Sequence, residues 1–383
     1  MSDFIFRVSP NVIIASYSAS RLGEFALEYG KRFMMVLDPV LRSVGLAEKI
    51  TQSLTDRNVD FFVFDELGEV SDSKTIDAAV KLARSSHIQG VIAAGGGKAV
   101  SVGRAVAALF NEKADIYSFL DGNSVTASPL PLIALCTTCR EANAFTDKIP
   151  LTDSRSNQLK VLKVSNSLCR AAVFDPNMSV TLTDNQTESM ELESLCLAAE
   201  SYFSQKANFF SDMLAQKSAE LLHLTMDGSE SLTVTSPKEE LRVQGGCLAG
   251  IASSASSFGP AGLLAMAINA RFKISRSLVA SILFPYVIED CAKFKTDRVS
   301  EFAGFFGIEG AEGADSQGKA QTFADNIRQR MAKANLPTRL KDLSVSIEQL
   351  ALAAEDAGKL EYANYLPRSM TSDDLFELIK AAY

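Results

Sequence analysis

Histidine and tryptophan are almost absent from this chain of 383 residues, which has no tryptophan and only two histidines, His87 and His223. Imidazole is the commonest side-chain ligand of transition metals, so a metal centre built on three histidines is excluded. His87 precedes a predicted strand. His223 lies on a predicted helix that ends near Thr225, with no carboxylate or cysteine at ligand spacing. We therefore expect surface or structural roles for both.

Long apolar runs are also missing. Each run is broken by glycine, proline or charge well before the roughly 18 residues that a membrane span requires, and no basic segment leads into an apolar one at the N-terminus. We expect neither a membrane span nor a signal peptide. The six cysteines are scattered through a large chain, which is typical of reduced, buried thiols in a cytoplasmic protein.

Acidic residues outnumber basic ones, with 46 Asp and Glu against 38 Lys and Arg and a net charge of -8. An acidic surface repels phosphate backbones, so we expect no nucleic-acid partner. Hydrophobic residues make up 47% of the chain, which is enough for two cores at ~100–200 residues per domain.

Short β-rich segments alternate with helical patterns as far as Pro176. Apolar segments without polar alternation are buried on both faces, so this order predicts an α/β domain with a parallel, doubly wound, Rossmann-like sheet. The predicted strands are 11–15, 32–37, 60–64, 90–94, 130–135 and 171–174, and the predicted helices are 20–29, 46–57, 73–85 and 100–110.

From Thr183 onward the β-rich segments disappear and apolar residues recur at helical spacing. The predicted helices are 188–203, 210–223, 238–253, 262–270, 277–294, 299–310, 319–334, 346–360 and 372–382. We therefore predict two domains, an α/β nucleotide-binding domain over residues 1–180 and an all-helical domain over residues 181–383.

A glycine-rich segment follows the predicted strand 90–94. Gly95, Gly96 and Gly97 precede Lys98 and open a helix. Glycines allow backbone N–H groups to approach a phosphate, the helix N-terminus adds partial positive charge, and Lys98 adds a full one. Three consecutive glycines exceed what an ordinary turn needs, so the segment favours phosphate binding. Asp38, at the end of another strand, fits either a ribose-binding acid or a turn residue before Pro39.

The order of segments resembles the iron-containing alcohol dehydrogenases, which have the dehydroquinate synthase-like fold. The segments that carry the resemblance are 9–14, 31–38, 44–50, 90–97, 131–138, 175–187, 336–337 and 364–368. The resemblance covers nearly the whole chain. It implies that the first domain binds NAD or NADP, that the second holds a divalent metal, and that the active site lies between them. It also implies a small-molecule substrate and allows a homo-oligomer.

The metal ligands of that family, an Asp and three His, do not occur at the matching positions. The match places Glu193 at the Asp position and Leu197, Gly262 and Arg276 at the His positions, with Met266 where the family has a further His. Such a set cannot hold Fe²⁺ or Zn²⁺, so we expect no metal.

Glu193 and Arg276 are the candidate catalytic residues. On the family fold they are expected to form a charge pair in place of the metal bond. Arg276 would then polarise a substrate carbonyl or hold a carboxylate or phosphate. The alternative is that both side chains merely fill the vacated pocket.

The second nucleotide loop of the family is altered here. Thr137 and Thr138 match it, but the following residues, Cys139 to Ala144, contain no glycine. Lys160 roughly matches a family lysine that reaches the cofactor. Cys136 and Cys139 have the spacing of a redox pair, although coincidence within a matching loop is the better interpretation. An NAD or NADP site remains predicted at Asp38, Gly95, Gly96, Gly97, Lys98, Thr137, Thr138 and Lys160, in weakened form.

Two functions from different classes follow. The first is a metal-independent, NAD(P)-linked oxidoreductase for a small alcohol or carbonyl, with Glu193, Lys273 or a tyrosine as proton donor. The second is a catalytically inactive family member that acts as a partner or regulatory subunit. A third, weaker possibility is a different reaction on a phosphorylated substrate that uses Lys98, Arg140 and Arg276.

Overall fold

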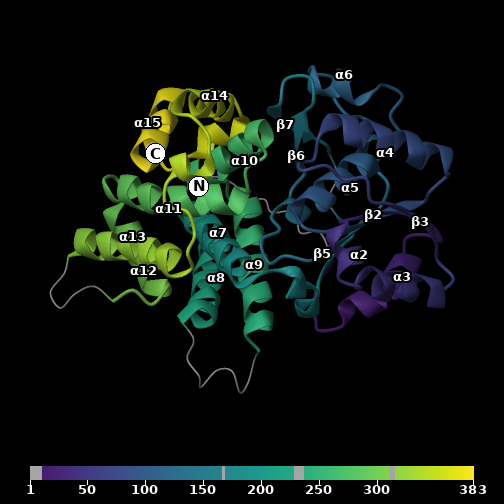
Figure 1. Cartoon of the computed structure of the whole chain (residues 1–383), viewed down its shortest axis with the longest axis horizontal. Helices are drawn as coiled ribbons and strands as arrows, with labels where there is room; N and C mark the ends of the chain where they lie inside the picture. Colours follow the sequence, from purple (N-terminus) through teal and green to yellow (C-terminus); the bar gives the residue numbers. More distant parts are fainter. Residues whose placement is uncertain (1–10, 166–168, 228–236, 310–314) are drawn as a thin grey trace. The chain divides into compact units, whose positions relative to one another are not determined.

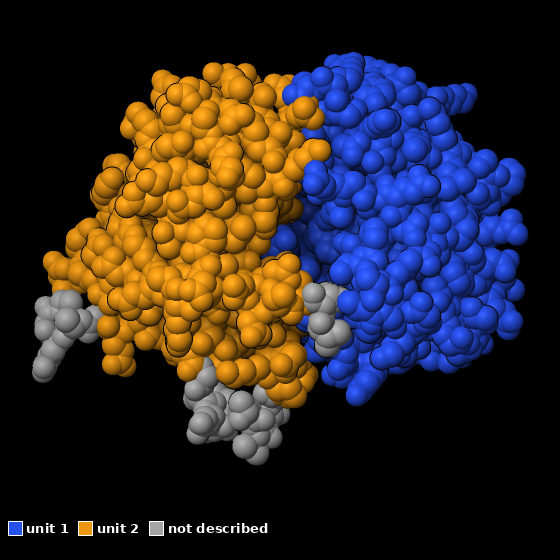
Figure 2. All heavy atoms as spheres, viewed as in Figure 1, with its two compact units in different colours: residues 1–156, 160–181 blue, residues 157–159, 182–383 orange. Residues whose placement is uncertain are grey.

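The computed structural model describes residues 11–165, 169–227, 237–309 and 315–383. The chain forms two compact units, which Figure 2 shows in different colours. Unit 1 comprises residues 1–156 and 160–181, and unit 2 comprises residues 157–159 and 182–383.

Unit 1 is built on a parallel sheet with the strand order β1-β8-β5-β4-β2-β3. Each neighbouring pair is parallel; for example, Met35 of β2 pairs with Ile92 of β4. The predicted strands are confirmed. Their bounds are β1 Asn11–Ile14, β2 Arg32–Leu37, β3 Asp60–Phe64, β4 Gly90–Gly95, β5 Leu132–Cys136 and β8 Ala171–Phe174.

Helices cover both faces of this sheet, with α3 on one side and α4 and α5 on the other (Figure 1). Successive strand residues alternate between the two faces, so Phe33, Met35 and Leu37 of β2 join the core beneath α3. On the opposite face, Gly103 of α5 packs so closely that a Cβ there would lie 2.7 Å from the Cβ of Ala93. The helices of unit 1 are α1 Leu22–Leu27, α2 Val40–Ser43, α3 Ala47–Asp56, α4 Ser73–Ser85, α5 Gly97–Leu109 and α6 Ile116–Leu120.

A separate two-stranded sheet was not predicted. It consists of β6 (Lys148–Asp153) and β7 (Gln158–Lys163), which begins within residues assigned to unit 2.

From residue 182 onward, the regular elements of the described part of unit 2 are all helices. The α7 helix begins with a capping box between Thr183 and Gln186, and nearly every residue of its second half is buried, which makes it the central helix of the unit. The bounds are α7 Asp184–Phe203, α8 Phe209–Asp227, α9 Lys238–Ala255, α10 Pro260–Phe272, α11 Arg276–Ala292, α12 Thr296–Phe305, α13 Ser316–Lys333, α14 Ile347–Gly358 and α15 Ser372–Ala382. Gly310, the end of one predicted helix, lies outside the described residues.

Two general expectations are tested by this fold. All six cysteines are buried and none is in a disulfide, so Cys136 and Cys139 are not joined to each other. Among the described residues, no single helix is long and apolar enough to cross a membrane; α9 and α10 meet that criterion only as a pair bent by 96°.

Candidate functional site

The glycine segment lies where β4 ends and α5 begins. Gly95 has a φ of +151°, and a Cβ at this position would lie 2.7 Å from the Cβ of Asp38 and 2.8 Å from that of Ala99. Only glycine fits such a backbone without displacement. Gly96 is the N-cap of α5 and has no side-chain cap, so the first N–H groups of the helix are left for a ligand or for water. The helix therefore starts at Gly97, earlier than the predicted 100–110.

Asp38 and Thr138 flank this turn. The N–H of Asp38 donates to the carbonyl of Ala94 at 2.8 Å, which fixes the aspartate beside the glycines. The Thr137 N–H donates to the Gly95 carbonyl at 3.1 Å. The hydroxyl oxygen of Thr138 would lie 3.8 Å from a Cβ at Gly96. This hydroxyl is buried and has no hydrogen-bond partner among the described residues.

An unsatisfied buried hydroxyl beside an uncapped helix N-terminus is suited to an anionic ligand, because both supply hydrogen-bond donors at the same turn. The structure thus brings together six predicted residues: Asp38, Gly95, Gly96, Gly97, Thr137 and Thr138.

The two predicted lysines are placed differently. Lys98 is half-buried on the first turn of α5. Lys160 lies on β7, where its charge acts on Asp153. The pKa of Asp153 is lowered mainly by hydrogen bonds from Arg155 and to a lesser extent by Lys160. Within the described residues, no hydrogen bond or ion pair joins Lys160 to the glycine turn.

The loop after Thr138 is filled by its own side chains. Glu141 and Asn143 are almost fully buried, and a Glu141 carboxylate oxygen accepts a hydrogen bond of 2.9 Å from the Asn143 N–H. Phe145 stacks on Phe174 with ring centroids 6.2 Å apart. Arg104 of α5 donates to the carbonyls of Thr146 and Lys148, which ties the end of the loop to the helix. This replaces the glycine-rich path expected from the resemblance.

In unit 2, α7 and α11 bring the two candidate catalytic residues together. Arg276 is the first residue of α11, and its Nη2 lies 3.6 Å from Oε1 of Glu193 on α7. The side chains are 20% and 10% exposed, respectively. Both side chains are therefore largely, but not completely, removed from solvent. Ser277 lies next to it and accepts a hydrogen bond of 3.3 Å from the hydroxyl of Ser189 on α7.

Sequence reasoning did not identify Glu200, which lies seven residues after Glu193 on the same face of α7. Its fully buried carboxylate accepts hydrogen bonds from the N–H groups of Gly259, Ala261 and Gly262 at 3.0, 2.6 and 3.1 Å. It thereby caps the N-terminus of α10. Burial raises the pKa of Glu200 to about 7, although these three hydrogen bonds act in the opposite direction. The seven-residue spacing of two glutamates was the available signal.

Comparison with known proteins decides the family. The family model described as "Iron-containing alcohol dehydrogenase" matches residues 9–176. The model described as "Fe-containing alcohol dehydrogenase family, C-terminal" matches residues 188–383. The chain belongs to the iron-containing alcohol dehydrogenase family.

Several members of this family are similar over nearly their whole length. Alcohol dehydrogenase 4 of Saccharomyces cerevisiae is 25% identical over 364 residues, covering 92% of this chain and 91% of the yeast protein. The 1,3-propanediol dehydrogenase of Citrobacter freundii is 22% identical and covers 92% of each chain. A crystal structure of 1,3-propanediol oxidoreductase has the same fold, with a TM-score of 0.91, 20% identity and full coverage of both chains. The sulfoacetaldehyde reductase of Bifidobacterium kashiwanohense, solved in complex with NAD⁺, has a TM-score of 0.83, with 19% identity over 100% of this chain and 99% of the reductase.

The metal implied by the family name does not fit the residues present. At the matching positions a single carboxylate, Glu193, faces the guanidinium of Arg276, and a permanent cation there repels a divalent ion. Gly262 cannot be replaced by a bulkier ligand without displacement, because a Cβ there would lie 3.0 Å from Oε2 of Glu200. Within the four described segments, no group of three or more His, Cys, Asp or Glu is arranged to hold a metal ion.

The two histidines lie elsewhere. His87 is exposed. His223 does have a carboxylate at helical spacing, contrary to the expectation, because α8 continues to Asp227. An oxygen of Asp227 lies 2.9 Å from Nδ1 of His223, and Arg330 pairs with the same aspartate. This arrangement is a structural contact of α8.

Proposed function

We propose that this member of the family is an NAD(P)-linked oxidoreductase for a small alcohol or carbonyl compound that works without a metal ion. The observation that carries the proposal is the glycine turn, where the buried Thr138 hydroxyl without a partner lies beside the uncapped N-terminus of α5. Both are suited to the phosphates of a dinucleotide. A bound nicotinamide supplies the hydride chemistry.

In unit 1, the N–H groups of Gly96 and Gly97 and the charge of Lys98 would hold the pyrophosphate, with Thr138 as a further donor. Asp38 would accept a hydrogen bond from a hydroxyl or amide of the nucleotide.

In unit 2, Arg276 would stabilise the negative charge that develops on the substrate oxygen. This role requires a cation held in place before the reaction, and Glu193 at 3.6 Å restrains the guanidinium in that way. The electrostatic role that the family gives to a dication would thus pass to a side chain.

Nucleotide binding is the direct test. Purified protein is titrated with NADH and with NADPH by nucleotide fluorescence, after its iron and zinc contents have been measured. We expect saturable binding of at least one nucleotide by metal-free protein. Thr138→Val should weaken that binding about fivefold, as expected for loss of one hydrogen bond worth ~1 kcal/mol.

Thr55→Val is the matched control, because Thr55 is exposed on α3 and its hydroxyl bonds only to the Thr51 carbonyl. It should leave nucleotide affinity unchanged. Reduction of small aldehydes by metal-free protein, followed by loss of NADH absorbance and abolished in Arg276→Gln, would support the complete proposal. Stoichiometric iron or zinc in active protein would refute it.

An inactive partner or regulatory subunit is the second candidate. The observation that favours it is the buried Glu141 in the loop after Thr138, which places a carboxylate in the segment that follows the nucleotide threonines. Failure of either nucleotide to bind at millimolar concentration to fully folded protein would favour this candidate over the oxidoreductase.

A further inference from the structure

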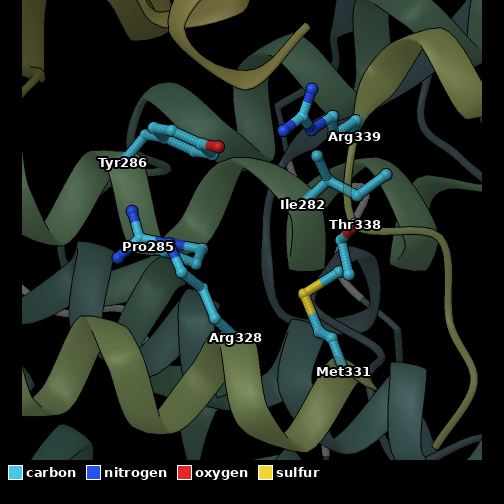
Figure 3. A pocket seen from close by; sticks show the side chains of 7 residues that line it. All are labelled: Ile282, Pro285, Tyr286, Arg328, Met331, Thr338 and Arg339. Carbon is cyan, nitrogen blue, oxygen red and sulfur yellow. The ribbon is translucent and has the colours of Figure 1, made fainter.

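A cavity of about 360 Å³ opens between α11, α13 and the segment that follows α13 (Figure 3). It lies wholly within unit 2 and contains neither Glu193 nor Arg276. Its size is at the lower end of the ~300–1,000 Å³ range of small-molecule sites. The lining residues are Ile282, Pro285, Tyr286, Arg328, Met331, Thr338 and Arg339.

The floor of the cavity is apolar. Ile282 and Pro285 of α11 are buried, and Met331 of α13 is 1% exposed, with its sulfur pointing into the cavity. These three side chains offer a surface for a compact aromatic or branched hydrocarbon group. A fully hydrated ion would gain nothing from such a floor.

The charge of one cationic side chain of the cavity is already neutralised by two carboxylates. Arg328 forms ion pairs with Glu289 at 2.7 Å and Asp325 at 2.9 Å, and its guanidinium lies 5.1 Å from the ring centroid of Tyr286. These contacts hold Arg328 and the tyrosine ring in place as one wall. They also leave Arg328 little charge for a ligand to neutralise.

The charge of the other cationic side chain, Arg339, is not neutralised by any described carboxylate. The guanidinium of Arg339 forms no ion pair or hydrogen bond with the described residues, and neither do the hydroxyls of Tyr286 and Thr338. In Figure 3 the Tyr286 hydroxyl and the Arg339 guanidinium point toward one another across one edge of the cavity. No carboxylate lines the cavity. A cationic ligand is therefore disfavoured, and an anionic group beside Arg339 is favoured.

We propose that this cavity is a binding site for a small organic monocarboxylate with a compact aromatic or branched apolar body. The carboxylate lies against Arg339 and accepts hydrogen bonds from the hydroxyls of Tyr286 and Thr338. The apolar body lies on Ile282, Pro285 and Met331. The site is separate from the nucleotide turn and from the Glu193–Arg276 pair, so it does not depend on the proposed function.

Calorimetric titration of the full chain with benzoate tests the proposal. We expect saturable binding at one site per chain, and binding at least about fivefold weaker for benzamide, which has the same shape without the charge. Arg339→Gln should weaken benzoate binding about fivefold, the modest effect expected of an exposed cation. Thr338→Tyr, at an exposed position, should block the cavity and abolish binding.

Two matched variants locate the site. Lys341→Gln removes one charge two residues away from Arg339 without touching the cavity, and it should leave benzoate affinity unchanged. Arg276→Gln should also leave it unchanged, which separates this cavity from the candidate catalytic pair. Equal binding of benzoate and benzamide, undiminished binding by Arg339→Gln and Thr338→Tyr, or no binding at millimolar concentration would each overturn the proposal.

Discussion

The buried carboxyl of Glu200 makes the stability of unit 2 depend on pH. Its pKa is about 7 in the folded chain, against an ordinary value of 4.5. Below about pH 4.5 the group is protonated in both the folded and the unfolded chain. Between the two values only the folded chain keeps the proton, so the free energy of unfolding falls as pH rises. Above about pH 7 both states are ionised and the fall ends.

The magnitude follows from the two pKa values. At roughly 1.4 kcal/mol per pH unit, a rise from 4.5 to about 7 corresponds to a loss of about 3 kcal/mol. Solvent does not reduce this effect, because the Glu200 side chain is fully buried.

The assay is urea unfolding of wild type and Glu200→Gln from about pH 4 to about pH 8, followed by helical circular dichroism, to which unit 2 contributes most. Glutamine is neutral throughout, so the wild-type free energy of unfolding minus that of the variant should fall by about 3 kcal/mol across this range. Glu355→Gln, at an exposed position on α14, is the control and should show no such change. A difference that stays flat or rises with pH would refute the reasoning, since it would mean that the three N–H donors offset or outweigh the effect of burial on the pKa of Glu200.

Two further predictions concern the candidate site. Glu193→Gln and Arg276→Gln should each lower the free energy of unfolding by about 1–2 kcal/mol, below the usual cost of breaking a fully buried pair, because the side chains keep 10% and 20% exposure. In denaturant titrations the double variant should lose less than the sum, and strictly additive losses would contradict the pairing. Gly95→Ala should destabilise unit 1 by about 1–3 kcal/mol through both strain and overlap with Asp38. Gly45→Ala, at a φ of +71° in open space, should cost only about 1 kcal/mol when the thermal unfolding of both variants is measured, and equal losses would argue against the overlap.

The fold was predictable where local pattern and burial agree. β2 and β4 consist mainly of consecutive apolar residues, a pattern that is typical of strands in a sheet covered on both faces. The bounds of both strands were predicted to within one residue. β6 and β7 carry lysines at 148, 160 and 163 and belong to a separate small sheet. The order of polar and apolar residues in β6 and β7 does not indicate which residues are buried, so sequence periodicity could not identify these strands.

The site was predictable only in part. The juxtaposition of Glu193 and Arg276 could be expected because residues far apart in sequence were placed by resemblance to a known fold. Glu200 was missed despite its seven-residue spacing from Glu193, since a glutamate on a helix normally faces solvent and its partners here are backbone groups at the start of another helix. Lys160 was assigned across an insertion, and it lies on β7, where its charge acts on Asp153; its expected contact with the cofactor stays a prediction.

The buried cysteines are natural probes of the order in which the two units unfold. Three of them, Cys136, Cys139 and Cys169, belong to unit 1, and the other three, Cys196, Cys247 and Cys291, belong to unit 2. Every thiol is sequestered, and burial raises the pKa of Cys169 to about 11 and that of Cys247 to about 12, so the native chain offers alkylating reagents almost no thiolate. Pulse alkylation followed by peptide mass spectrometry would therefore record, without any engineered probe, which unit exposes its interior first.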